Sequence, residues 1–120
     1  MKVAVTSQGA DLASEVDPRF GRAKFFIVVD TETGRSTTHD NAQNLNAVQG
    51  AGIQAAQNAV NLGVDAVITG SVGPKAFTTL QAGNVKAYIG ATGSVTAAVE
   101  QLEAGQLECA GKPNVEGHWV

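Results

Sequence analysis

Two strand-like runs that follow each other in the chain both end in four residues that begin and end with glycine. Val64–Thr69 leads into Gly70–Gly73, the first tetrad, and Val85–Ile89 leads into Gly90–Gly93, the second tetrad. A helix-like stretch follows each tetrad, and strands that alternate with helices form parallel sheets, which bind ligands beside the carboxyl ends of their strands. Glycine there lets backbone N–H groups approach a ligand at a helix start. We therefore expect both tetrads at one sheet edge, facing an anionic guest.

Length and composition exclude several classes of protein. The chain has 120 residues, 43% of them hydrophobic, and a single cysteine, which indicates one domain with a real core and no internal disulfide. Its net charge of −3 argues against nucleic-acid binding, which needs an excess of Lys and Arg. The N-terminal apolar run is too short for a signal peptide, and no stretch approaches the roughly 20 apolar residues that span a bilayer. We expect a cytoplasmic protein with no membrane partner.

The spacing of apolar residues predicts an α/β domain with a mixed five-stranded sheet of order 3-2-1-4-5 and helices on both faces. A hairpin turn at Asp30–Gly34 makes the third strand parallel to the first, so four strands end at the same edge. Residues 1–107 form one expected domain, and 108–120, which lack periodicity, an expected C-terminal tail. The expected strands are 2–6, 25–29, 35–39, 64–69 and 85–89, and the expected helices are about 50–62, from 74, and about 95–102.

Several motifs, in this order and spacing, resemble the dinitrogenase iron–molybdenum cofactor biosynthesis family. They are Phe20–Ala23 before a hydrophobic strand, Gly50–Ile53 at a helix start, Gly63–Ile68 followed by Gly70-x-x-Gly73-Pro74, and Gly105–Leu107. The resemblance implies a ribonuclease-H-like three-layer fold and a protein that holds or passes a metal–sulfur cluster. The single-domain form is similar to the orange proteins, small family members that carry a molybdenum–copper sulfide cluster.

One position departs from the family pattern. Many members have a histidine, able to ligate cluster metal, immediately before the Gly-x-Gly that opens the first helix, and this chain has Gln49. An amide is a poor ligand for a soft metal. The departure favours a molybdenum–copper sulfide cluster, coordinated by its own sulfides, over the iron–molybdenum cofactor.

A cluster of basic residues gives the second candidate contact. Arg19, Arg22 and Lys24 place three of the eight basic residues within six positions. A thiometallate cluster is a large soft anion, which weakly hydrated, donor-rich guanidinium groups suit. An ordinary solvated loop is the alternative, and simple strand-to-helix turns are the alternative for the tetrads. The candidate cluster-binding residues are Arg19, Phe20, Arg22, Gln49, Gly70, Ser71, Gly73, Lys75, Gly90 and Thr92, with no catalytic residue and no protein metal ligand.

Other polar and aromatic residues carry a weaker signal. Cys109 and His118 lie nine residues apart in the expected tail, and we interpret them as incidental rather than as a metal pair. His39 is interpreted as a surface histidine, and Trp119 as a packing or partner contact.

Three functions compete. The first is non-enzymatic binding, storage or carriage of an anionic metal–sulfide cluster. A nuclease, which ribonuclease-H-like folds support, needs several carboxylates around two metal ions, and the first strand, Lys2–Thr6, has none. A cluster-free regulatory or assembly module that binds a partner protein is the alternative. The resemblance also suggests partnership with Min-type ATPases or a cluster-receiving protein.

Overall fold

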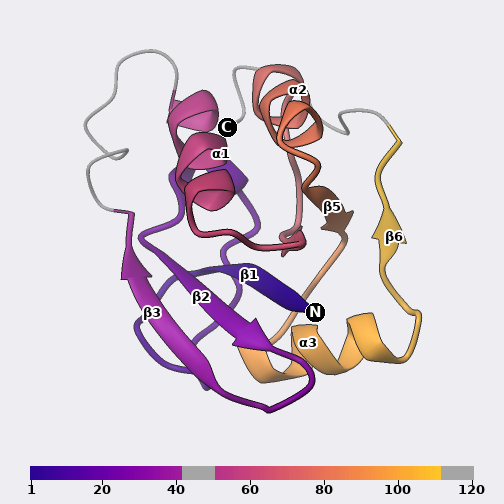
Figure 1. The fold of residues 1–120 in the computed structure, drawn as a ribbon. Coiled ribbons are helices and arrows are strands. Elements are labelled where there is room, and N and C mark those ends of the chain that lie inside the picture. The colour runs from indigo at the N-terminus through magenta and orange to yellow at the C-terminus, as the bar shows by residue number, and fades with distance from the viewer. Residues whose placement is uncertain (42–50, 112–120) are drawn as a thin grey trace.

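The structure is a computed structural model that describes residues 1–41 and 51–111. Within these residues, one six-stranded sheet of order β3-β2-β1-β4-β5-β6 forms the centre of the molecule (Figure 1). Its strands are β1 (Lys2–Ser7), β2 (Phe25–Asp30), β3 (Ser36–Asp40), β4 (Ala66–Ile68), β5 (Lys86–Ile89) and β6 (Glu108–Cys109).

The strand directions bring several carboxyl ends to one edge. β1 pairs with β4 in parallel and β4 with β5 in parallel, whereas β2 is antiparallel to both β1 and β3. β1, β3, β4 and β5 therefore all end at the same edge of the sheet. The expected order 3-2-1-4-5 is confirmed for the first five strands. The hairpin turn is confirmed too, because Gly34 has a φ of 75° and its N–H donates to Asp30 O at 2.8 Å.

We expected five strands, but the sheet in the described residues has six. β6 pairs antiparallel with β5, and the Ala110 N–H continues the pairing by donating to Ala87 O at 2.8 Å. A strand of two exposed residues has no periodicity to detect, so the sequence gives no sign of it. β6 adds to the sheet two residues that we had assigned to the tail. The ribonuclease-H-like label and the boundary at residue 107 stay predictions.

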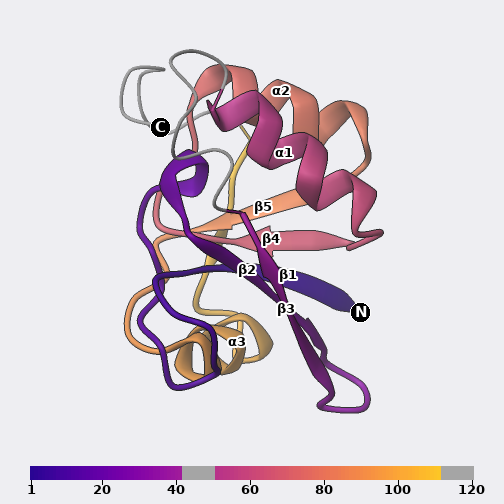
Figure 2. The ribbon, with the colours of Figure 1, turned by 90° about the vertical axis from the view of Figure 1, so that its left-hand side faces the viewer.

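Helices cover both faces of the sheet, as expected. α1 (Ala51–Asn61) and α2 (Pro74–Ala82) lie on one face and α3 (Val95–Glu103) on the other (Figure 2). Each face has its own apolar core. Phe20, Phe26, Phe77 and Leu80 belong to the core under α1 and α2, and Val3, Val5, Val95 and Val99 to the core over α3.

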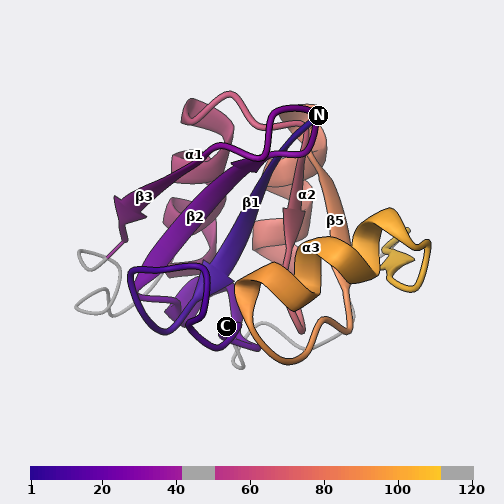
Figure 3. The same cartoon turned by 90° about the horizontal axis from the view of Figure 1, so that it is seen from below.

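Two connecting segments complete the described chain. The loop after β1 lies beside α3 on the α3 face (Figure 3), where Ala10 O accepts a hydrogen bond from Thr38 Oγ1 at 2.8 Å. A short 3₁₀ helix, η1 (Phe20–Arg22), follows it before β2 begins. No helix among the described residues has the length and apolar character needed to cross a membrane.

Candidate functional site

The first tetrad holds the basic loop, which we define as Asp17–Lys24. Ser71 Oγ donates to Pro18 O at 2.9 Å, and the Phe20 N–H donates to Ser71 O at 3.2 Å. A Cβ on Gly70 would lie 2.8 Å from both Pro18 Cα and Pro18 O, so only glycine allows this approach without a backbone shift. The structure thus brings Arg19, Gly70 and Ser71 together at the carboxyl end of β4.

Two buried threonines fix the loop to the sheet edge. Thr6 Oγ1 donates to Asp17 O at 2.7 Å and lies 2.9 Å from Thr69 Oγ1, and both threonines are fully buried. The Asp17 carboxylate accepts the Arg19 N–H at 3.0 Å. Paired buried polar groups stabilise one arrangement, because leaving them unpaired costs the full desolvation of the group. Sequence reasoning missed these three residues, although a threonine at the end of each of two apolar strands was the available signal.

Within the basic loop, the two arginines and the phenylalanine have different positions. Arg19 is exposed, and Arg22, the last residue of η1, is half-buried. Phe20 is fully buried, and its ring centroid lies 5.7 Å from that of Phe26. Contrary to our expectation, the Phe20 ring is therefore in the core and anchors the loop from beneath, because its apolar area is removed from water there.

The N-terminus of α2, which continues the first tetrad, has free donors. Gly73 is the N-cap residue and provides no side-chain cap, and Pro74 has no N–H. Across residues 1–41 and 51–111, the N–H groups of Lys75 and Ala76 donate to no acceptor. The Lys75 side chain is exposed. Ala76 is fully buried, so Lys75 provides the accessible amide of this pair. This amide, the positive end of the helix dipole and the Lys75 cation lie together beside the basic loop, an arrangement that suits an anion.

At the N-terminus of α3, which follows the second tetrad, the backbone amides already donate to acceptors of the same chain. Ser94 Oγ accepts the Ala97 N–H at 3.1 Å. The Val95 N–H donates to Ser14 O at 2.9 Å, and the Thr96 N–H donates to Leu12 O at 3.1 Å. The first three amides of α3 are therefore paired within the chain, and none of them is left for a ligand.

The second tetrad lies at the same sheet edge, but its polar backbone groups are hydrogen-bonded to other parts of the chain. The Gly90 N–H donates to Gly70 O at 3.2 Å, which ties the two tetrads together. Thr92 is exposed, and its carbonyl accepts Gln101 Nε2 at 2.9 Å. Gly90 and Thr92 thus border the edge without adding backbone donors from α3.

Of the remaining candidates, the structure describes His39 and Cys109. Gln49, His118 and Trp119 lie outside the described residues. His39 is half-buried on β3, with Nε2 2.9 Å from Thr37 Oγ1, and Cys109 is exposed on β6. In the described ranges, no group of three or more His, Cys, Asp and Glu residues is arranged to hold a metal ion.

Comparison with known proteins decides the family. Residues 1–105 match the family model described as dinitrogenase iron-molybdenum cofactor. The chain belongs to this family. The match confirms the resemblance seen in the motifs and covers the basic loop, both tetrads and all three helices.

Relatives of known structure share the whole fold. The apo form of the orange protein from Desulfovibrio gigas is 42% identical with a TM-score of 0.92, over 95% of this chain and 96% of that one. A putative NifB protein from Thermotoga is 38% identical with a TM-score of 0.83, over 97% and 98% of the two chains. An uncharacterized protein of Methanocaldococcus jannaschii is 29% identical over 97 residues, 79% of this chain and 82% of that protein. The two solved structures therefore share the fold of this chain over nearly its full length.

Proposed function

We propose that this protein binds and carries an anionic metal–sulfide cluster and catalyses no reaction on it. The observation that carries the proposal is the open N-terminus of α2 beside a basic loop that is fixed to the same sheet edge. Family membership and the likeness to an orange protein support a carrier or scaffold. In this role the cluster is cargo.

The chain's own groups would hold the cluster without covalent bonds. The N–H group of Lys75 donates to a sulfide, and the cationic heads of Arg19, Arg22 and Lys75 balance the cluster's negative charge. The first tetrad sets the distance between these groups, because Gly70 and Ser71 contact the loop directly. Since these donors are fixed before binding, little ordering entropy is lost when the cluster arrives.

We further propose that the cargo is a molybdenum–copper sulfide cluster rather than an iron–molybdenum cofactor. The amide of Gln49 stands where many family members have a ligating histidine, so the sulfides themselves would complete the coordination of the metals. Gln49 remains a proposed contact through its amide. The receiver would be a cluster-accepting protein or a Min-type ATPase, to which an exposed site at a sheet edge gives access.

The test is a titration of the full chain with tetrathiomolybdate and copper, followed by gel filtration and visible absorption. We expect visible bands that co-elute with the protein at a fixed ratio of metal to protein. Arg19→Ala/Arg22→Ala should weaken binding about tenfold or more, because two charge-assisted contacts are lost, and added salt should weaken the wild type.

Arg35→Ala is the matched control, since it removes the same side chain from the β2–β3 hairpin, far from the first tetrad. It should bind the cluster as the wild type does. Colour that elutes only with free inorganic species would contradict the carrier function and favour the cluster-free module that binds a partner protein. Unchanged binding by the double variant would rule out the basic loop.

A further inference from the structure

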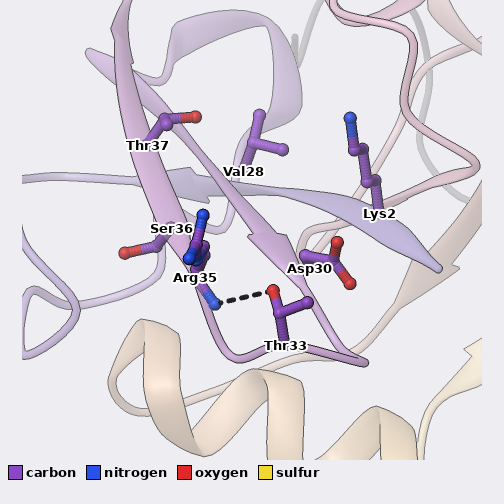
Figure 4. Close-up of a pocket in the computed structure, with 7 residues that line it drawn as sticks. All are labelled: Lys2, Val28, Asp30, Thr33, Arg35, Ser36 and Thr37. Atoms are coloured by element: carbon purple, nitrogen blue, oxygen red, sulfur yellow. Dashed lines mark hydrogen bonds between the residues drawn. The ribbon is translucent and has the colours of Figure 1, made fainter.

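A pocket separate from the proposed cluster site lies at the opposite end of the sheet, where β1 begins and the β2–β3 hairpin turns. Its volume is about 300 Å³, at the lower end of the range for small-molecule sites. Figure 4 shows the side chains around it, which come from β1, β2, the hairpin turn and β3. The lining residues are Lys2, Val28, Asp30, Thr33, Arg35, Ser36 and Thr37.

Neither of the two cations of this pocket forms a close ion pair with another described residue, although the charge of Lys2 acts on the Asp30 carboxylate of the same pocket. The ion pair found in the described part of the chain joins the Met1 amino group and Glu32 at 3.7 Å, and it includes neither Lys2 nor Arg35. Lys2 and Arg35 are both exposed. Both side chains are therefore available to a negatively charged group of a ligand, in a protein whose net charge is −3.

The one carboxylate of the pocket is already engaged by the hairpin turn. Asp30 Oδ1 accepts the Glu32 N–H at 2.9 Å. That hydrogen bond, assisted by one from the Thr33 backbone, lowers the pKa of Asp30 below its ordinary value, so the carboxylate is charged at neutral pH. It can still accept a hydrogen bond from a bound molecule, and Figure 4 shows it between Lys2 and Arg35.

The frame of the pocket is held by backbone contacts. The Asp30 N–H donates to Arg35 O at 2.9 Å, and the Arg35 N–H donates to Thr33 Oγ1 at 3.3 Å, drawn in Figure 4. Lys2 is tied separately, because its N–H donates to Asp65 Oδ2 at 2.8 Å. Val28 packs against the core under α1 and α2 and gives the pocket an apolar floor.

We propose that this pocket binds a small organic anion whose phosphate or carboxylate head meets Lys2 and Arg35 and whose hydroxyl or amino group donates to Asp30. Arginine and lysine in one pocket suit an oxyanion, because the guanidinium donates two parallel hydrogen bonds and the ammonium adds a point charge. The carbon skeleton of the ligand lies on Val28. The site is independent of the proposed cluster site, which lies at the other end of β1 and β4.

The test uses glycerol 3-phosphate as the probe and amide NMR shifts of the full chain as the readout. We expect saturable shifts confined to Lys2, Val28, Asp30 and residues 33–37, and none with glycerol alone. Lys2→Ala and Arg35→Ala should each weaken binding roughly fivefold, the effect of one exposed charge contact. Inorganic phosphate should bind more weakly than glycerol 3-phosphate, because it lacks the carbon skeleton and the alcohol donors.

The control is Lys86→Ala, which removes an exposed cation from β5, outside the pocket, and should bind the probe as the wild type does. Shifts that do not saturate, shifts spread over the basic residues at large, or equal affinity in the Arg35→Ala variant would overturn the proposal. Failure here would leave the cluster proposal intact, because cluster binding is measured separately, by visible absorption, on the same variants.

Discussion

The two tetrads look alike in the sequence, but only the first leads to a helix with free donors. The N-cap residues Gly73 and Ser94 have nearly the same backbone conformation, with φ and ψ of −85° and 174° for Gly73 and −76° and 165° for Ser94. The serine caps its helix and the glycine does not. The side chain at the N-cap therefore decides whether the third amide of the helix has a partner, because Ser94 Oγ accepts the Ala97 N–H and Gly73 has no such group.

The loop between β1 and β2 accounts for the rest of the difference. Its residues Leu12 and Ser14 accept the first two amides of α3. Its residues Pro18–Phe20 contact the first tetrad through Gly70 and Ser71, and within the described residues they accept no hydrogen bond from the Lys75 and Ala76 amides of α2. One loop thus closes one helix start and places cations beside the other.

Among the substitutions that separate the two tetrads, the largest expected effect comes from Gly70→Ala. The added Cβ would lie 2.8 Å from Pro18 backbone atoms, so the basic loop must move. We expect cluster affinity to fall about tenfold, equal to about 1.4 kcal/mol, and stability to fall by about 1–3 kcal/mol from overpacking. A visible-absorption titration and urea unfolding measure the two effects.

Gly90→Ala is the matched control in the second tetrad. Gly90 has a φ of 83° and no neighbour within 4 Å of an added Cβ, so the cost is backbone strain of about 1–2 kcal/mol. Affinity for the cluster should not change. Equal loss of affinity in both variants would show that the tetrads do not differ in binding.

A smaller effect is expected from Gly73→Ser. Serine in this backbone conformation can accept a hydrogen bond from the second or third amide of α2, so it competes with the ligand for the Lys75 amide. We expect a gain in stability of a few tenths of a kcal/mol and a loss of affinity of about fivefold, the value of one hydrogen bond. Ser94→Gly is the reverse change and should not create a second site, because Val95 and Thr96 keep their partners. Affinity that is unchanged by Gly73→Ser would show that the α2 amides do not contact the cluster.

The smallest effect on affinity is expected from Thr69→Val. Valine keeps the shape but removes the hydroxyl that lies 2.9 Å from Thr6 Oγ1 beneath the basic loop. Stability should fall by about 1 kcal/mol, and affinity about twofold as the loop loosens. Thr96→Val removes a hydroxyl bound to Leu12 O on the α3 side and should leave affinity unchanged. An affinity loss in Thr96→Val as large as in Thr69→Val would mean that the effect is not local.

Much of the fold could be predicted because it depends on local patterns. The hairpin turn, the apolar strands and Pro74 at a helix start each leave a short signature, and right-handed crossovers then restrict the sheet order. β6 could not be found, because Glu108–Cys109 is held by pairing with β5 and not by any pattern of its own.

The site was harder to predict because its geometry depends on contacts between distant residues. The basic loop and the first tetrad were both identified, but the contact between Pro18 and Gly70 joins segments over 50 residues apart in the sequence. Phe20 was misplaced because an aromatic ring beside two arginines looks the same in sequence whether it points outward or into the core. The cap at Ser94 had a local signal, a serine directly before an apolar helical stripe, and it could have separated the two tetrads in advance.

The most direct test of the central claim is a map of amide shifts when the molybdenum–copper sulfide cluster binds to the full chain. The account predicts shifts at Arg19, Arg22, the first tetrad and Lys75–Ala76, with Val95–Ala97 unchanged. Shifts centred on Val95–Ala97, or spread equally over both helix starts, would contradict it.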